Sequence, residues 1–263
     1  MKKEKFWGGI SLTCWGKMII DAHTHYFEQW CGLKGLSPEE FIEQLNRNNI
    51  DKAIVFTMTG FFGNTRQANN EIAELIMRYP NRLYGFATVN PYEGKGARKE
   101  IRRAVKELGL KGLKLHPWVQ GFSVTGDLMF PIVEECINLD VPLIFHDGTP
   151  PYSTPLQIAH LAYLYSDAKI ILGHAGLKDM WENALDAARN FSNIWLCVNG
   201  TPSLGIETMI REIGSDRIVY GSDAGFGDPG HITYELLKIQ NLEIEEKHKR
   251  KILGENIMKL LFG

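Results

Sequence analysis

The feature that most constrains the fold of this chain is a regular alternation of short apolar runs with amphipathic stretches from Met18 onward. The apolar runs recur at intervals of roughly 24–34 residues, which is the length of one strand followed by one helix. Several runs are branched or aromatic throughout, as in AIVF at 53–56, and such runs are typical of parallel strands buried on both faces. The eight expected strands are 18–22, 52–57, 83–89, 112–116, 141–146, 169–174, 194–198 and 218–222.

Helix signals lie between these runs. Residues 37–40 read Ser-Pro-Glu-Glu, which supplies an N-cap, a proline in the first turn and early acidic residues. A second helix is expected from Thr65 to Tyr79, and residues 243–261 predict a closing helix or a pair broken at Gly254. Eight strand–helix repeats predict an α/β fold, a single-domain (β/α)8 TIM barrel over residues 18–263. A doubly wound sheet of eight strands is the alternative, because the pattern does not show closure.

Residues 1–17 precede the repeats and are expected to be an N-terminal extension. They begin basic, but their apolar stretch is short, is broken by Gly8 and Gly9, and lacks the cleavage site of a signal peptide. The four cysteines form no C-x-x-C pair, which is typical of reduced thiols in a cytoplasmic protein. The net charge of −2 argues against a nucleic-acid partner, and no apolar run is long enough to span a membrane.

Four of the eight histidines lie at the ends of expected strands, where a parallel barrel places its active site. His23 and His25 occur in the sequence IDAHTHYF, and alternate residues of a strand point to the same side. Two imidazoles on one face form half of a nitrogen-rich metal site. Two histidines in a surface loop would give the same spacing, so the position at the end of the first strand favours the metal site.

Three further polar residues follow later strands. His146 ends the fifth expected strand, His174 ends the sixth, and Asp223 follows the eighth. Each has a structural alternative: a histidine can bind a backbone carbonyl in the core, and an aspartate after a strand can cap the next turn. The order in which these polar residues follow strands one, five, six and eight is a stronger indication of an active site than any one of them.

That order resembles the amidohydrolase superfamily, which has H-x-H on strand one, histidines on strands five and six, and an aspartate on strand eight. The resemblance is closest to the amidohydrolase 2 branch, which includes enzymes like aminocarboxymuconate-semialdehyde decarboxylase. It covers nearly the whole chain from Met18. The segments that carry it are Asn70, 79–82 (YPNR), 85–86 (GF), 112–117 (GLKLHP), 173–176 (GHAG), 221–223 (GSD) and 252–257 (ILGENI).

The resemblance implies one divalent metal ion with His23, His25 and His146 as ligands and Asp223 completing or flanking them. Zinc suits three imidazoles and a carboxylate best, with manganese, iron or cobalt as alternatives. His174 would be the general base, and Asp223 would share the proton transfer.

Lys114 lies two residues before His116 on the same expected strand, so both side chains point to the same side. Lys114 is expected to contact an anionic substrate. A carboxylated lysine that bridges two metals and a structural lysine are its alternatives. His116, Trp118 and Arg66 are further candidates for substrate binding, although a solvated arginine at a helix start fits Arg66 better.

The ligand set predicts hydrolysis of an amide, a lactone or a related cyclic carbonyl of a small molecule. The same set also serves non-oxidative decarboxylation of an aromatic or enol acid, which is the alternative. A barrel that binds metal and ligand without turnover is a third possibility.

Several aromatic residues occupy loops that should follow strands, and they are expected either to line an apolar pocket or to pack the loops together. These residues are Phe27, Trp30, Phe61, Phe62, Trp118, Phe122 and Phe226. Insertions or a second copy of the chain would bury such loops, so a homodimer is one of the expected states.

Overall fold

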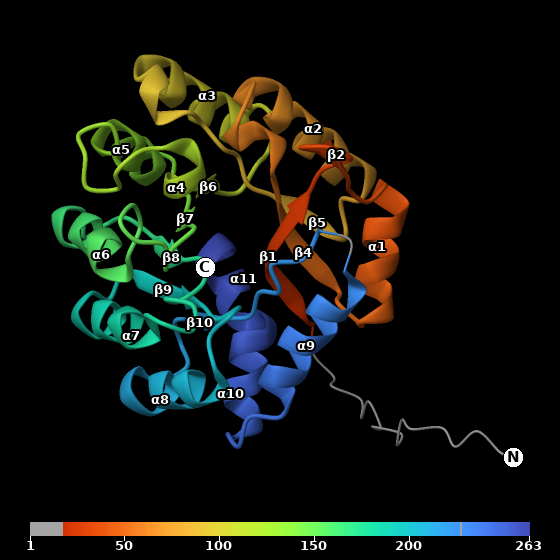
Figure 1. Cartoon of the computed structure of the whole chain (residues 1–263), viewed down its shortest axis with the longest axis vertical. Helices are drawn as coiled ribbons and strands as arrows, with labels where there is room; N and C mark the ends of the chain where they lie inside the picture. Colours follow the sequence, from red (N-terminus) through yellow and green to blue (C-terminus); the bar gives the residue numbers. More distant parts are fainter. Residues whose placement is uncertain (1–17, 227) are drawn as a thin grey trace, which may run out of the picture.

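The computed structural model describes residues 18–226 and 228–263. The expected N-terminal extension, residues 1–17, therefore lies outside the described residues, and the domain boundary at Met18 stays a prediction. Eight parallel strands form the centre of the structure, and helices surround them (Figure 1). These strands are β1 (Ile20–Tyr26), β4 (Lys52–Thr57), β5 (Leu83–Gly85), β6 (Leu113–Leu115), β7 (Leu143–Phe145), β8 (Ile170–Leu172), β9 (Ile194–Cys197) and β10 (Ile218–Val219).

The strands close into a barrel. Hydrogen bonds order them as β1-β4-β5 and as β10-β9-β8-β7-β6, and two parallel bridges join these groups. Ala87 bridges to Leu113 at one junction, and Thr24 bridges to Ala224 at the other. The predicted TIM barrel is confirmed, and closure excludes the doubly wound alternative, whose sheet has two free edges.

The first strand differs most from its prediction. It was expected to end at Ala22, where the apolar run ends, but β1 continues through both histidines to Tyr26. Its polar half pairs with the chain that follows β10, since the His25 amide donates to the Ala224 carbonyl at 2.7 Å. A short antiparallel hairpin, β2 (Gln29–Trp30) and β3 (Leu33–Lys34), follows it.

The helices start where their signals predict. Ser37 forms a complete capping box with Glu40, and α2 begins at Thr65. Around the expected break at Gly254 the chain forms a π-helical turn, Lys251–Glu255, between two helices. The helices are α1 (Pro38–Arg47), α2 (Thr65–Arg78), α3 (Lys95–Lys106), α4 (Pro117–Gln120), α5 (Phe130–Asn138), α6 (Pro155–Leu164), α7 (Trp181–Asn190), α8 (Ser203–Ile213), α9 (Pro229–Gln240), α10 (Glu246–Arg250) and α11 (Asn256–Phe262), with 3-10 turns at Thr59–Phe61 and Pro91–Glu93. Within the described residues, no helix combines the length and apolar character needed to cross a membrane.

Helix α11 fills one end of the barrel. Figure 1 shows it at the centre of the ring of strands. Ile257 and Leu260 of this helix pack against apolar residues that point into the barrel, among them Ile20, Phe56 and Ile171. The strand ends that carry the histidines lie at the other end, so the apolar and polar halves of the interior are separated.

We expect Ile257→Ala to lower the free energy of unfolding by about 2–5 kcal/mol, because it leaves a cavity in a fully buried contact. Lys259→Ala, on the exposed side of the same helix, should change it by less than about 0.5 kcal/mol. Urea denaturation followed by circular dichroism measures both. Equal midpoints for the two variants would show that α11 does not stabilise the barrel.

Candidate active site

Two histidines and an aspartate meet at the carboxyl end of β1. His23 and His25 are buried, and their Nε2 atoms lie 3.3 Å apart. Asp223 Oδ1 lies 3.2 Å from His23 Nε2 and 3.1 Å from His25 Nε2. The Asp223 amide donates to the His23 carbonyl at 2.8 Å, which fixes the carboxylate beside both rings.

The hydrogen-bonding state of His23 supports a cation at this point. Its Nδ1 lies 2.9 Å from the Gly173 carbonyl oxygen, which only accepts hydrogen bonds, so Nδ1 carries the proton. Burial lowers the pKa of His23 well below its ordinary value, so the ring is neutral and Nε2 presents a lone pair to the Asp223 carboxylate. Two acceptor atoms at this distance repel each other unless a positive charge lies beside them, and either the Lys114 ammonium, 3.1 Å from His23 Nε2, or a metal ion would supply that charge.

The spacing of the three atoms also fits a metal ion. Ligands about 2.1 Å from a common ion lie about 3.0–3.4 Å apart in octahedral or tetrahedral geometry. His23, His25 and Asp223 have separations of 3.1–3.3 Å. A ring nitrogen of His174 joins this group, since the ligand atoms of His23, His174 and Asp223 lie within 4.8 Å of one another.

His146 lies beside His174 and outside this trio. Its Nδ1 is 2.8 Å from His174 Nε2, and its Nε2 is 3.0 Å from the Thr149 hydroxyl. His116 stacks on the His146 ring with centroids 3.8 Å apart. The predicted role of His146 as a ligand therefore needs its Nε2 to turn from Thr149 to the ion.

Lys114 reaches the same cluster from β6. Its side chain is fully buried, and Nζ lies 3.1 Å from His23 Nε2 and 5.1 Å from the centre of the Phe56 ring. Burial lowers the pKa of Lys114 to about 8, while the Asp223 carboxylate opposes that shift. The amine is therefore mostly cationic at neutral pH.

Burial governs the protonation of the surrounding histidines as well. It lowers the pKa of His25, the pKa of His174 to about 4, and the pKa of His116 to about 2. Burial acts in the opposite direction on Asp223, but its contacts with the His23 and His25 rings hold its pKa well below the ordinary value. At neutral pH the site thus combines neutral imidazoles with one carboxylate, as a divalent ion requires.

The other substrate-binding candidates lie at different distances from the cluster. The His116 ring packs against Phe61, and Trp118 lies next to it with more than half of its surface exposed. Arg66 is on the outer side, where its guanidinium pairs with Glu100 of α3 at 3.3 Å. Of the three predicted substrate-binding residues, His116 therefore lies at the site, Trp118 lies at its rim, and Arg66 points away from it toward α3.

Aromatic side chains cover the cluster on the side of β1. The Phe226 ring lies 5.4 Å from the His25 ring and also packs against Phe27 and Trp30. These residues were expected to line an apolar pocket, and Phe27 and Phe61 are in fact buried in one small core with Met58. The aromatic groups thus limit the access of water to His25.

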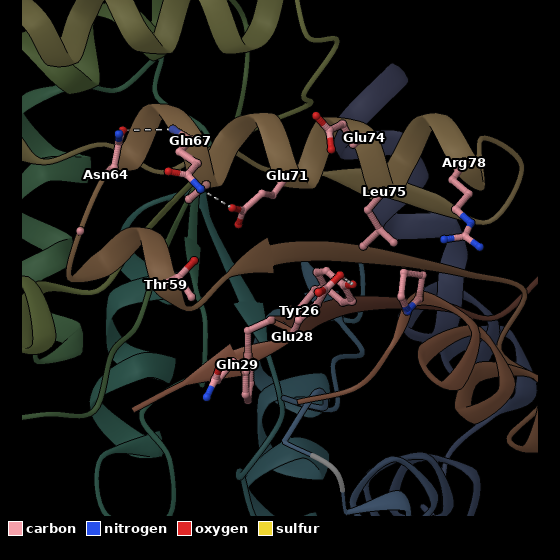
Figure 2. A pocket seen from close by; sticks show the side chains of 14 residues that line it. Tyr26, Glu28, Gln29, Thr59, Asn64, Gln67, Glu71, Glu74, Leu75 and Arg78 are labelled. Atoms are coloured by element: carbon pink, nitrogen blue, oxygen red, sulfur yellow. Dashed lines mark hydrogen bonds between the residues drawn. The ribbon is translucent and has the colours of Figure 1, made fainter. Parts of the chain in front are cut away.

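A separate groove of about 730 Å³ lies between the β1–β2 segment and α2. Figure 2 shows Glu28, Glu71 and Glu74 among its lining residues, with Arg78 at one end. The clustered histidines take no part in its lining. It is a surface groove beside the barrel mouth, with several acidic side chains in its lining.

Two residues that sequence reasoning missed hold the histidines in place. Asp147 is fully buried and accepts the amide of His174 at 2.6 Å and the amide of Gly176 at 2.7 Å. Asn199 is buried beside the His174 ring. Both follow apolar runs, in the sequences LIFHDG and WLCVNG, and a polar residue directly after a buried strand was the available signal.

A sequence model of the family Amidohydro_2, described as amidohydrolase, matches residues 20–263. The 2-amino-3-carboxymuconate-6-semialdehyde decarboxylase of Dictyostelium discoideum is 29% identical over 176 residues, which cover 58% of this chain and 48% of that protein. The gamma-resorcylate decarboxylase of a Polaromonas species is 27% identical over 252 residues, covering 74% of this chain and 76% of that protein.

Solved structures share the fold. The 5-carboxyvanillate decarboxylase of Novosphingobium aromaticivorans superposes with a TM-score of 0.76 at 18% identity, covering 94% of this chain and 96% of that one. A dihydroxybenzoic acid decarboxylase from a Polaromonas species has a TM-score of 0.73 at 20% identity, covering 93% and 97%.

These relatives correct the expected reaction. Hydrolysis of an amide or lactone was predicted, but the curated relatives described above are decarboxylases, so that prediction is wrong and its alternative is favoured. The physical reason is that a metal held by imidazoles and a carboxylate can polarise either a carbonyl or a carboxylate. The ligand set alone does not select between the two reactions.

We expect Asp147→Asn to lower the free energy of unfolding by about 1–3 kcal/mol or more. The new amide group would face the Gly176 amide, so two buried donors would oppose each other. Asp186→Asn removes an exposed carboxylate that pairs with Arg189, and it should cost at most about 1 kcal/mol. Thermal denaturation of both variants tests this, and equal stability of Asp147→Asn and wild type would contradict it.

Proposed function

The chain belongs to the amidohydrolase family, and we propose that it is a metal-dependent non-oxidative decarboxylase of a small aromatic or enol carboxylic acid. The observation that carries the proposal is the pairing of a cation site, made by His23, His25 and Asp223, with the buried cationic side chain of Lys114. One part suits a divalent ion and the other an anionic substrate. The names of the relatives support the same reaction.

The metal centre is proposed to hold one divalent ion through His23, His25 and Asp223, with His146 joining them. When bound, such an ion polarises the carboxylate and a neighbouring oxygen of a substrate. The solved decarboxylases of Novosphingobium and Polaromonas contain manganese, so manganese stands beside zinc as the candidate. Imidazole and carboxylate ligands accept both metals.

Lys114 is proposed to bind the substrate anion. An ammonium group in a buried site attracts a carboxylate more strongly than one in water, because the surroundings screen the charge less. The aromatic groups of Phe226 and Phe61 lie close to the same cluster and suit the face of a planar acid. His116, which packs against Phe61, and the neighbouring Trp118 would extend this aromatic wall.

In decarboxylation, the substrate carbon that loses the carboxylate must take up a proton. The bond between the substrate carbon and its carboxylate breaks, carbon dioxide leaves, and the electron pair stays on the carbon, which then takes up a proton. His174 and Asp223 both face the cluster at the barrel mouth, and both are unprotonated toward it at neutral pH. We propose that one of them first takes a proton from a substrate hydroxyl or from water and then passes it to the carbon.

Decarboxylation is tested by measuring carbon dioxide release from 2,6-dihydroxybenzoate, 5-carboxyvanillate and 2-amino-3-carboxymuconate semialdehyde with Mn²⁺ or Zn²⁺. We expect turnover of at least one acid, loss of activity with a chelator, and recovery when metal is restored. His23→Ala and Asp223→Asn should lower kcat/KM by about 100-fold or more and weaken metal binding measured by calorimetry.

Arg189→Ala is the matched control, because Arg189 lies on the outer surface of α7 and pairs with Asp186 and Glu212. It should leave both turnover and metal content unchanged. Protein that binds no divalent ion, or that releases no carbon dioxide while His23→Ala matches wild type, would refute the proposal.

A further inference from the structure

The His174 ring has two nitrogens with different neighbours. Nδ1 meets the side-chain oxygen of Asn199, and Nε2 faces His146 Nδ1 at 2.8 Å. A neutral imidazole carries its proton on one nitrogen only. The role of His174 therefore depends on which nitrogen is protonated.

The orientation of the Asn199 amide decides this. Its Nδ2 donates to the Gly173 carbonyl at 3.0 Å, and that carbonyl has no hydrogen to give. Turning the amide around would place oxygen against oxygen, so Oδ1 must face His174. Because Oδ1 only accepts, His174 must carry its proton on Nδ1.

We propose that Asn199 is a positioning residue that holds His174 as the Nδ1-protonated tautomer, so that Nε2, which faces His146 at the edge of the cluster, carries the lone pair. The inference rests on the proposed function for its catalytic consequence, but the tautomer is a property of the protein alone. Asn199 is buried with about 1% of its surface exposed, so water does not compete for its oxygen.

The same carbonyl fixes His23. The Gly173 oxygen accepts from Asn199 Nδ2 at 3.0 Å and from His23 Nδ1 at 2.9 Å, so one backbone atom sets the tautomers of two histidines. Gly173 can hold this position only without a side chain, because a Cβ atom would lie 2.4 Å from the Phe145 carbonyl oxygen. Strand β8 thereby comes close enough for its terminal carbonyl to reach both partners.

The assignment continues outward to His146. With His174 Nε2 unprotonated, His146 Nδ1 must donate to it, and His146 Nε2 then accepts from the Thr149 hydroxyl. The lone pair of His146 is therefore on Nε2, which is the atom that would bind an ion. The chain of hydrogen bonds has one direction, from Thr149 at the half-buried rim to the Gly173 carbonyl in the interior.

The direct test is nitrogen NMR of the metal-free protein labelled with ¹⁵N-histidine. The His174 signals are assigned by their loss in His174→Gln. We expect a protonated Nδ1 and an unprotonated Nε2 in wild type, and loss of this preference in Asn199→Leu, which has a similar size but no acceptor. Asn199→Asp keeps the acceptor for His174 Nδ1 and should keep the tautomer, but its second oxygen cannot donate to the Gly173 carbonyl, so we expect it to lower stability.

Kinetics provide the second readout. We expect Asn199→Leu to lower kcat by about 10–100-fold with KM changed by less than about threefold, and Asn199→Asp to recover most of that loss. Asn193→Leu is the matched control at the opposite end of β9, where Asn193 donates to the Ala162 and Tyr165 carbonyls. It should reduce stability without altering kcat or the His174 signals.

A protonated Nε2 in wild-type His174 would overturn the proposal, and so would an unchanged tautomer in Asn199→Leu. The wild-type spectrum decides the question even where a variant fails to fold. The spectrum needs no substrate, so a correct tautomer in a protein without decarboxylase activity would refute the proposed function and leave this inference standing.

Discussion

The active site depends on the seam at which β1 meets the end of β10. Three backbone hydrogen bonds form it: Ala22 to Tyr220 at 2.9 Å, Asp223 to His23 at 2.8 Å, and His25 to Ala224 at 2.7 Å. The seam brings Asp223 next to histidines that lie almost two hundred positions earlier in the chain. An ion held by residues from both sides would bind only the closed barrel, so metal binding and barrel closure stabilise each other.

The interior of the barrel balances two opposing requirements. Buried imidazoles, the Lys114 amine and the Asp21 and Asp147 carboxylates are costly to remove from water unless they are hydrogen-bonded. Backbone groups at the strand ends meet much of this need, since Asp21 accepts the amides of His23 and Ser222 and Asp147 accepts two more. At the other end, α11 buries apolar side chains that need no hydrogen-bond partners. This hydrophobic burial stabilises the barrel and offsets the cost of the buried polar groups at its mouth.

The features of the fold that depend on local sequence patterns could be predicted from the sequence. Strand β4 matches its expected limits at 52–57, because its apolar run has sharp ends. Strand β1 extends beyond its apolar run because its polar half pairs with residues 55–57 of β4 on one side and bridges to Ala224 on the other. Periodicity does not reveal these partners. The convergence of His23, His25, His174 and Asp223 followed from strand order, whereas the direction of His146 and the role of Asn199 depend on side-chain packing across strands. The reaction could not be predicted from the sequence for a different reason: the same metal ligands support both hydrolysis and decarboxylation.

What separates those two reactions is the charge that surrounds the metal ligands. Hydrolysis of a neutral amide or lactone develops negative charge only in the transition state, whereas a carboxylic acid already brings a negative charge that a buried ammonium group can bind. Arg66 pairs with Glu100 on the outer surface, and Lys114 touches His23 directly. A substrate carboxylate next to Lys114 would therefore lie beside the ion, with the unprotonated nitrogen of His174 close by. For the proposed reaction, this arrangement would place the bond to be broken, the charge that holds it and a nitrogen able to accept a proton within one small volume at the barrel mouth.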